Sequence, residues 1–596
     1  MSLKRQTFQI VEVDYDRCTR TYGSAPCTAA LGTTGERKCF NTFATCQDQA
    51  NYEQGTYTVR YCKNQAGIPK GEGLLPFLQS VSTSPAEISL GAPDENIGTL
   101  GKRASVTIKL KGGTQGDWLV DPYYSERISG AAQADGIGYN PDAIGSHFPK
   151  MRARQVYFQN RRVRVKNGEV GDTIASIPSR EYILTGWADD INNNTTLQAK
   201  DIIDLTDDRK SLYPAPSEGR IVGDIADSGL PSFDLTPSGV GADYAASGYA
   251  TIGNEIVGYT ISGDTVTLTE RAALTTEAEA HSDGDTFQTC GVFQDVLLED
   301  AAETLFLAAQ GVTSDDLDTT QWATERLDTL AGLRLTRVVP KPTGVKTLLS
   351  ELCALGLTFY LDDLSGKVKL YVNRPLSYDE TSTALSDDVS VIEGTLSRRD
   401  LSDQITTQVA YFHGVRRWTD DLSKSENYDR AFINIDSDLR STDALGQDRI
   451  KQFFQPWFGT VGNDPFARAI STRYATRYAE PQERVSFVAD YKDLASLELT
   501  SVIDLTTRAM TDVTGAAEAR QVQVVAREDV DPGHRIAVTV QTYQLEGRWG
   551  YLMTSTDTSD YDSATDAEKA KGCYMIDETD PDYPEFDDGT TPYLVY

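Results

Sequence analysis

Histidine is the scarcest of the residues on which catalysis usually depends. Only four occur in 596 residues, at His147, His281, His413 and His534. None belongs to an H-E-x-x-H pair, and the sequence has neither a G-x-S-x-G nucleophile elbow nor a phosphate-binding P-loop. The sequence therefore predicts that the protein is not an enzyme, and each histidine is expected at the surface or in a turn.

Long apolar runs are absent too. No stretch approaches the roughly 20 consecutive apolar residues that a membrane-spanning helix needs. The first residues, MSLKRQTFQIVEVDYD, carry charges but no apolar core of a signal peptide. We therefore expect a protein without a stable membrane anchor that folds in the cytoplasm.

Basic residues are outnumbered by acidic ones, 56 to 88, which gives a formal net charge of −32. Surfaces that grip nucleic acid are clusters of Lys and Arg that neutralise phosphates. The charge balance excludes a large surface of that kind, so DNA could pass the protein without binding specifically. An acidic surface also keeps a large protein soluble, which is the simpler interpretation.

The chain is long enough for roughly three to five domains, because a single core stops growing at a few hundred residues. Alternating polar and apolar residues predict a half-buried strand at 105–111, and short apolar runs predict strands at 155–158 and 181–184. Residues 218–290 are rich in Gly, Asp, Ser and Thr. Short strands at 249–252, 255–259 and 265–268 make this stretch a small all-β module.

Helices are predicted in the second half. Apolar residues recur at helical spacing over 296–308 and 345–355, and the second helix leads into a hairpin of 357–361 and 368–372. A third helix is predicted from Asp464, as N-cap, to about Tyr478. Its arginines, Arg468, Arg473 and Arg477, are expected on a solvated face or an interface. Strands are predicted again at 485–488, 522–525 and 536–540.

The predicted fold class is a multidomain, mainly β protein with α+β parts. Apolar periodicity ends near residue 550, where Asp and Glu dominate, so the tail is not expected to fold alone. The expected segments are a four-cysteine segment at 1–75, a first β domain at 76–217, the small β module at 218–292, a helix and hairpin domain at 293–375, a second β domain at 376–548 and an acidic tail at 549–596.

Cysteines are few but unevenly placed. Of the eight, five crowd the first 62 residues, and Cys290, Cys353 and Cys573 are isolated. Cys353 falls in a predicted helix and is expected in a core. Cys62 ends the alternating strand 56–61, so a buried strand thiol is favoured there.

Cys18, Cys27, Cys39 and Cys46 are the candidate metal ligands. Intervals of 8, 11 and 6 residues separate them, wider than the C-x-x-C knuckles of structural zinc sites. Cytosolic thiols stay reduced, which disfavours disulfides, and four thiolates are the ligands of an iron–sulfur cluster. An iron–sulfur cluster is favoured, with zinc or disulfides as alternatives. Neighbouring Arg17, Arg20, Arg37 and Lys38 are expected to lower the thiol pKa values.

The cysteine segment resembles that of siphophage tail-tip proteins, the lambda type among them, in which four cysteines bind a [4Fe–4S] cluster. Weaker similarity to phage baseplate hub proteins extends over 101–108 and 248–285. The resemblance in the cysteine segment rests on Tyr22-Gly23-Ser24-Ala25-Pro26-Cys27-Thr28-Ala29-Ala30, Lys38-Cys39-Phe40-Asn41-Thr42 and Thr45-Cys46-Gln47-Asp48.

The resemblance implies a structural baseplate hub at the virion tail tip, assembled in the host cytoplasm. Hubs of this family are trimers in which each subunit supplies two tube-like β domains to a pseudo-hexameric ring that continues the tail tube. The implied partners are the distal tail protein, the tape-measure terminus and a central tail fibre or other tip proteins, with DNA passing through the lumen. The alternatives are a tail-associated cell-wall hydrolase and a receptor-binding or glycan-binding tip protein.

Overall fold

The computed structural model describes most of the chain up to Tyr543. Within 6–543 it leaves out 66, 70–72, 91–99, 114–115, 208, 210, 363–364, 377–381, 388, 402–403, 460–462, 491–493, 495–496 and 532–533, and beyond 543 it describes only 551, 552, 565, 572 and 573. Most of the acidic tail expected at 549–596 therefore lies outside the described residues. Among those described there, β30 (Tyr551–Leu552) pairs in parallel with β31 (Gly572–Cys573).

The first large sheet has eight strands in the order β3-β2-β1-β6-β7-β8-β5-β4. Its core forms because alternate residues, such as Val106, Ile108 and Leu110, point to one face and are buried there. The strands expected at 105–111 and 181–184 are confirmed. The strands are β1 (Thr7–Cys18), β2 (Gln54–Cys62), β3 (Leu74–Leu75), β4 (Leu78–Ser84), β5 (Ser105–Lys111), β6 (Arg162–Glu169), β7 (Ser179–Asp189) and β8 (Asn194–Lys200). Because β1 and β2 belong to this sheet, the boundary expected at residue 75 falls inside it.

Two long insertions leave this sheet. Residues 19–53 join β1 to β2 and carry the cysteines, while residues 112–161 join β5 to β6 and contain α1 (Asp117–Val120), α2 (Tyr124–Ser129) and α3 (His147–Arg154). The strand predicted at 155–158 is wrong. These residues follow α3 as turns in which Val156 and Tyr157 are exposed, so the apolar run there does not mark a buried strand.

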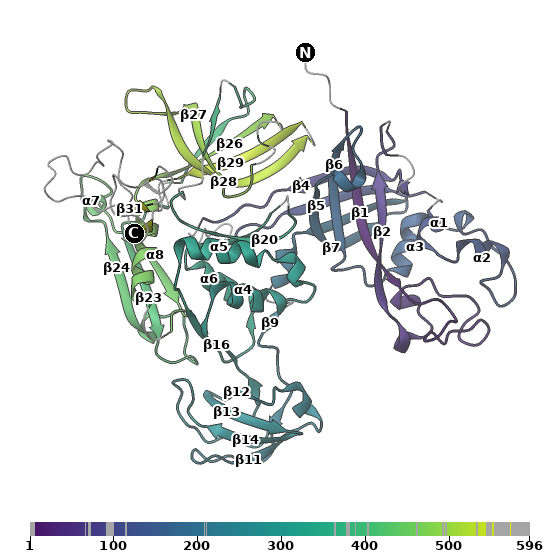
Figure 1. The fold of residues 1–596 in the computed structure, drawn as a ribbon, viewed down its shortest axis with the longest axis horizontal. Helices are drawn as coiled ribbons and strands as arrows, with labels where there is room; N and C mark the ends of the chain where they lie inside the picture. The colour runs from purple at the N-terminus through teal and green to yellow at the C-terminus, as the bar shows by residue number, and fades with distance from the viewer. Residues whose placement is uncertain are drawn as a thin grey trace.

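The small β module predicted at 218–292 has a six-stranded sheet of its own and projects from the rest of the molecule (Figure 1). The strands lie in the order β10 (Arg220–Ile221), β11 (Ser232–Thr236), β14 (Thr265–Glu270), β13 (Glu255–Ser262), β12 (Ser247–Ile252) and β15 (Gln288–Thr289). Beside its apolar core, Glu255 is fully buried and accepts hydrogen bonds from Arg271 and His281. Burial alone would raise the pKa of Glu255, but these bonds lower it to about 2.

Helices fill the centre of the molecule, between the two large sheets and the three-stranded sheet (Figure 1). The predicted helices and hairpin are confirmed, and Cys353 is buried as expected. The elements are β9 (Leu212–Tyr213), β16 (Gly291–Val296), α4 (Leu298–Leu307), α5 (Thr319–Thr329), β17 (Leu335–Val339), β18 (Thr343–Gly344), α6 (Val345–Cys353), β19 (Leu357–Leu361) and β20 (Val368–Val372).

A three-stranded sheet in the order β24 (Tyr428–Ile435), β23 (Gln408–Val415) and β25 (Ile450–Gln455) packs against α8 (Asp464–Arg477), and α7 (Ser437–Arg440) follows β24.

The expectation for the α8 arginines is partly wrong. Arg468 is exposed, whereas Arg473 and Arg477 are buried, and Arg477 donates to Asn373 and to Gln523, 2.9 Å away. The helix is capped one residue earlier than predicted, by Asn463.

The second large sheet has six strands, which confirms the strands predicted at 485–488, 522–525 and 536–540. They lie in the order β21 (Thr383–Ser386), β27 (Val502–Thr511), β28 (Ala517–Asp531), β29 (Arg535–Thr542), β26 (Gln482–Asp490) and β22 (Ser397–Leu401). Together the sheets confirm the predicted fold class, mainly β in several domains with α+β parts. No helix of the described residues is long and apolar enough to cross a membrane.

The two large sheets touch although they come from opposite ends of the chain (Figure 1). The chain just after β4 meets β28, where the Ile88 amide donates to the Val525 carbonyl at 2.9 Å. Further along β28, Asp529 accepts from Asn167 of β6 at 3.3 Å and pairs with Arg180 of β7 at 3.0 Å. The two sheets are therefore held side by side by backbone and ionic contacts.

Three of the four histidines are buried, so the expectation of surface positions is wrong for His147, His281 and His413. Only His534 lies half-buried in a turn. His147 is fully buried in the core of the first sheet, and its Nε2 lies 3.1 Å from the Tyr61 hydroxyl. Burial disfavours the imidazolium ion and lowers the pKa of His147 to about 3.

This shift predicts acid sensitivity of the first sheet. The free energy of unfolding that neutral His147 contributes is complete above the unfolded-state pKa of about 6.5 and is lost as pH falls toward 3, because only the unfolded chain then takes up the proton. Replacing His147→Gln removes the titrating group. Urea unfolding between pH 7 and 4 should therefore show a shallower loss of stability for the variant than for the wild type. Equal slopes would contradict the assignment.

Candidate four-thiol site

The cysteine-bearing segment 19–53 begins and ends on paired strands. Cys18 is the last residue of β1 and lies opposite Gln54, the first residue of β2. The sheet therefore fixes the position of Cys18 directly. Within the segment, η1 (Phe43–Thr45) and η2 (Gln49–Asn51) are single turns, and the other three cysteines lie on loops.

Asn41 connects Cys18 to Cys39. Its carbonyl accepts a hydrogen bond from the Cys18 amide at 2.7 Å, and its side-chain Oδ1 lies 3.6 Å from the Cys39 Sγ. Asn41 has a φ of 56°, a left-handed conformation that asparagine tolerates better than most residues. The two contacts bring the end of β1 and the Cys39 turn together.

Asp48 makes the corresponding connection between Cys27 and Cys46. Its carboxylate accepts from the amide of Thr28 at 2.7 Å and from the hydroxyl of Thr28 at 2.9 Å. Its own amide donates to the Cys46 Sγ at 3.4 Å. Hydrogen bonds from backbone amides to sulfur stabilise thiolate ligands and tune iron–sulfur clusters.

The four thiols lie within electrostatic reach of one another. The pKa of Cys39 is raised, first by burial and then by the nearby Cys46, Cys27 and Cys18, although a hydrogen bond with Asn41 opposes the rise. The pKa of Cys46 is also raised, again mainly by burial, with Cys18 and Cys27 contributing. The thiols of Cys39 and Cys46 therefore each lie close enough to Cys18 and Cys27 for their charges to interact.

The neighbouring cations do not lower these two pKa values, contrary to expectation. Their charges are engaged elsewhere. The Arg20 Nε lies 3.3 Å from the Glu53 carboxylate, Lys38 lies 2.6 Å from that of Glu126, and the Arg17 guanidinium lies 5.0 Å from the centre of the Tyr57 ring. Burial therefore dominates the pKa values of Cys39 and Cys46.

The four thiols are all reduced. The seven cysteines outside the tail are all free, so the four thiols form no disulfides. Within the described part of the chain, no group of three or more His, Cys, Asp or Glu side chains is arranged to hold a metal ion. Four thiolates are the ligand set of structural zinc and of iron–sulfur clusters alike, so the residue types alone do not separate these two occupants.

The other cysteines lie apart from this site. Cys62 is buried in β2 as expected, where it packs in a small apolar cluster with Phe8 and Ile10, and burial raises the pKa of its thiol. Cys290 and Cys353 are buried in the centre of the molecule. Cys573 lies in β31.

The sequence analysis missed the residues of the second insertion, 112–161, that pack on the cysteine segment. Arg127 is fully buried and donates to the carbonyl of Cys39, and the hydroxyl of Tyr123 accepts from the amide of Tyr22 at 2.9 Å. Arg127 is 88 positions from Cys39, and Tyr123 is 101 positions from Tyr22. No short-range pattern connects the two segments, so the sequence alone gave no signal.

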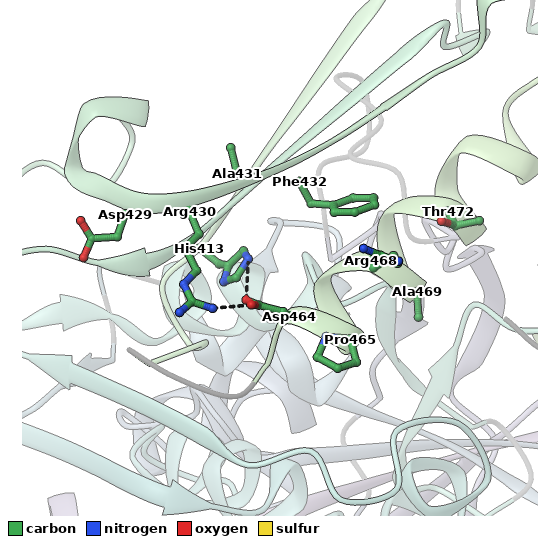
Figure 2. A pocket seen from close by; sticks show the side chains of 10 residues that line it. All are labelled: His413, Asp429, Arg430, Ala431, Phe432, Asp464, Pro465, Arg468, Ala469 and Thr472. Carbon is green, nitrogen blue, oxygen red and sulfur yellow. Dashed lines mark hydrogen bonds and ion pairs between the residues drawn. The ribbon is translucent and has the colours of Figure 1, made fainter.

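The largest pocket described is a groove of about 1010 Å³ between β24 and α8 (Figure 2). The edge strand β24 supplies Arg430 and Phe432, and α8 supplies Asp464 and Arg468. Figure 2 shows His413 and Arg430 converging on the Asp464 carboxylate, with the His413 Nε2 3.5 Å away. Burial lowers the pKa of His413. The sequence analysis did not predict this groove, because its two walls are joined only by the fold.

No protein-family model matches the chain, and no curated protein matches it. Two of the solved structures that are similar to it are prophage tail proteins. One is the prophage tail protein gp18 from Listeria monocytogenes EGD-e, with a TM-score of 0.31 and 9% identity over 75% of this chain and 86% of that chain. The other is the 43 kDa tail protein of prophage MuSo2 from Shewanella oneidensis, with a TM-score of 0.35 and 10% identity over 78% of this chain and 94% of that chain.

The Asp48 contacts make a local prediction. Replacing Asp48→Ala removes the acceptor that holds Thr28, so the Thr28 amide should exchange with deuterium roughly tenfold faster, as the loss of one hydrogen bond implies. Replacing the exposed Asp135→Ala in the other insertion is the control and should leave Thr28 unchanged. Hydrogen exchange of the reduced, iron-free protein measures both. Unchanged exchange in Asp48→Ala would show that the cysteine loops are held by other contacts.

Proposed function

We propose that the protein is a structural component of a tailed-bacteriophage tail, in the same class as the two prophage tail proteins to which it is similar, and that it acts as a baseplate hub at the tail tip. The observation that carries the proposal is the pair of large, mainly antiparallel sheets held side by side in one chain. Because each subunit contributes two large sheets, few subunits are needed to close a ring that forms the wall of a tube.

In a ring of three copies, six large sheets would surround the axis. Because the ring has six sheets but three subunits, it would join a sixfold tail tube to a threefold tip. Closed rings of identical subunits use head-to-tail contacts, in which one surface of a subunit meets a different surface of the next. The ring would join the distal tail protein above it and a central fibre or other tip proteins below it. It would also contact the tape-measure terminus until infection.

The charge of the chain agrees with a conduit. With a net charge of −32, a wall made of this protein would repel the phosphates of DNA that passes through the lumen. The proposed location of the protein is the tail tip of the virion, after assembly in the host cytoplasm. In this proposal the protein has no membrane anchor and makes no specific contact with DNA.

We further propose that Cys18, Cys27, Cys39 and Cys46 hold a [4Fe–4S] cluster. The support is the convergence of four free thiols on loops that are cross-connected through Asn41 and Asp48. When bound, the cluster supplies four iron–thiolate bonds that hold the cysteine segment in one shape. The chain supplies the sulfur ligands, the amide bond to the Cys46 Sγ and a partly buried position.

We do not propose an enzymatic activity. The groove in Figure 2 is the best candidate for one, since His413 faces a carboxylate there, and a cell-wall hydrolase is the rival it would support. Both carboxylates of the groove are ion-paired, however, Asp464 with Arg430 and Asp429 with Arg416. The small module is the candidate surface for the other rival, receptor or glycan binding.

Oligomeric state tests the hub proposal. The purified protein should reach a mass of three times the 65.4 kDa of one chain, or do so when mixed with its distal tail partner. Native mass spectrometry over a range of concentrations measures this. Gold-labelled antibodies should mark the tip of intact tails. A chain that remains monomeric with its partner, or that is absent from virus particles, would contradict the proposal.

Metal analysis tests the cluster proposal. Anaerobically purified protein should contain about four iron and four sulfide ions per chain, as expected for the cluster. Cys39→Ala should lose most of both. Cys62→Ala removes a buried thiol outside the site and should keep the wild-type content. An iron-free wild type, or equal iron in Cys39→Ala and wild type, would remove the assignment.

A further inference from the structure

We infer that Arg127 is a positioning residue of the four-thiol site, and that it fixes the backbone of Cys39 before any cluster is bound. The inference rests on the proposed site and names the residue that arranges one of its ligands. Arg127 comes from α2 of the second insertion, 88 positions after Cys39. Two nitrogens of its guanidinium group donate to the cysteine segment.

The guanidinium of Arg127 makes three directed bonds. Its Nη1 donates to the Lys38 carbonyl at 3.1 Å and its Nη2 donates to the Cys39 carbonyl at 2.8 Å. Its Nε donates to the Asp121 carboxylate at 2.5 Å, and both side chains of this ion pair are almost fully buried. The planar fork therefore holds two successive carbonyls in fixed directions, which a lysine ammonium cannot do.

The residue after Cys39 is held by the same insertion. The Arg127 guanidinium lies 3.9 Å from the centre of the Phe40 ring, and that of Arg154 lies 4.2 Å from it. Arg154 pairs in turn with the buried Asp117 at 3.1 Å. The fully buried Arg127–Asp121 pair and the partly buried Arg154–Asp117 pair thus converge on the Cys39–Phe40 turn, with the arginines on α2 and α3. Cation–π contacts of this kind strengthen when water is excluded.

Backbone contacts align the two insertions beside this turn. The amide of Lys38 donates to the Ala132 carbonyl at 2.9 Å, and the amide of Ala134 donates to the Glu36 carbonyl at 3.0 Å. These bonds place the residues before Cys39 along the second insertion, and Arg127 fixes the turn itself. The position of Cys39 is therefore set by protein contacts alone, which is the property that a preformed ligand site requires.

Alkylation of the reduced, iron-free protein tests this without a cluster. In Arg127→Met, Cys39 should react with iodoacetamide about tenfold faster relative to Cys46, as expected when hydrogen bonds to a charged group are lost. Arg127→Lys keeps a charge for Asp121 but loses the fork, and should change Cys39 in the same direction. If Arg127→Met does not fold, the Arg127→Lys variant alone provides the test. Peptide mass spectrometry reads each cysteine separately.

Arg326→Met is the matched control, because Arg326 is also buried and pairs with a single glutamate, Glu299, in the helical centre. It should leave the ratio of Cys39 to Cys46 reactivity unchanged. An unchanged ratio in both Arg127 variants, or an equal change in Arg326→Met, would overturn the inference.

Iron loading adds a second readout and separates this inference from the cluster proposal. Reconstituted with ferrous iron and sulfide, the Arg127 variants should bind iron roughly 10- to 100-fold more weakly than the wild type, the range typical of residues that orient ligands. Wild type that takes up no iron would end the cluster proposal, and the alkylation result would still decide the role of Arg127. Wild-type affinity in both Arg127 variants would overturn the positioning role.

Discussion

The hydrogen bond from the Ile88 amide to the Val525 carbonyl marks the constraint on which the architecture depends. It joins the segment after β4 of the first sheet to β28 of the second, and the strands of these two mainly antiparallel sheets are separated by hundreds of residues in sequence. The ionic contacts of Asp529 with the first sheet lie further along the same strand, β28. Two sheets fixed side by side form a continuous stretch of wall, whereas two independently moving sheets would not. The proposed hub role follows from this junction.

The four-thiol site depends on the same first sheet but on different contacts. The sequence analysis assigned its four cysteines to a metal centre and predicted no other contact that holds the segment. The structure instead shows loops cross-connected through Asn41 and Asp48 and packed against the second insertion, with Arg127 buried between them. In our account a cluster would occupy a site that is already shaped, and would stabilise it further rather than create it.

Most of the strands and helices that were predicted from patterns of local period are confirmed, because alternation and helical spacing are properties of neighbouring residues, but elements such as β1, β6 and α5 were not predicted. The patterns failed at 155–158, where an apolar run lies in turns, and at His147, His281 and Arg477, which are buried through contacts with distant segments. The cysteine spacing pointed to the four thiols that the fold brings together, but it could not reveal Arg127 or the groove beside α8. Both arise where separate parts of the chain meet, and such contacts leave no local pattern.

Hydrogen exchange at the Ile88 amide is the most direct test of the junction between the sheets. If the two sheets form one body, this amide is protected nearly as strongly as the amides within β28, since exchange then requires the sheets to separate. If Ile88 exchanges as fast as an exposed loop while both sheets remain protected, the sheets move independently and the account of a continuous wall is wrong.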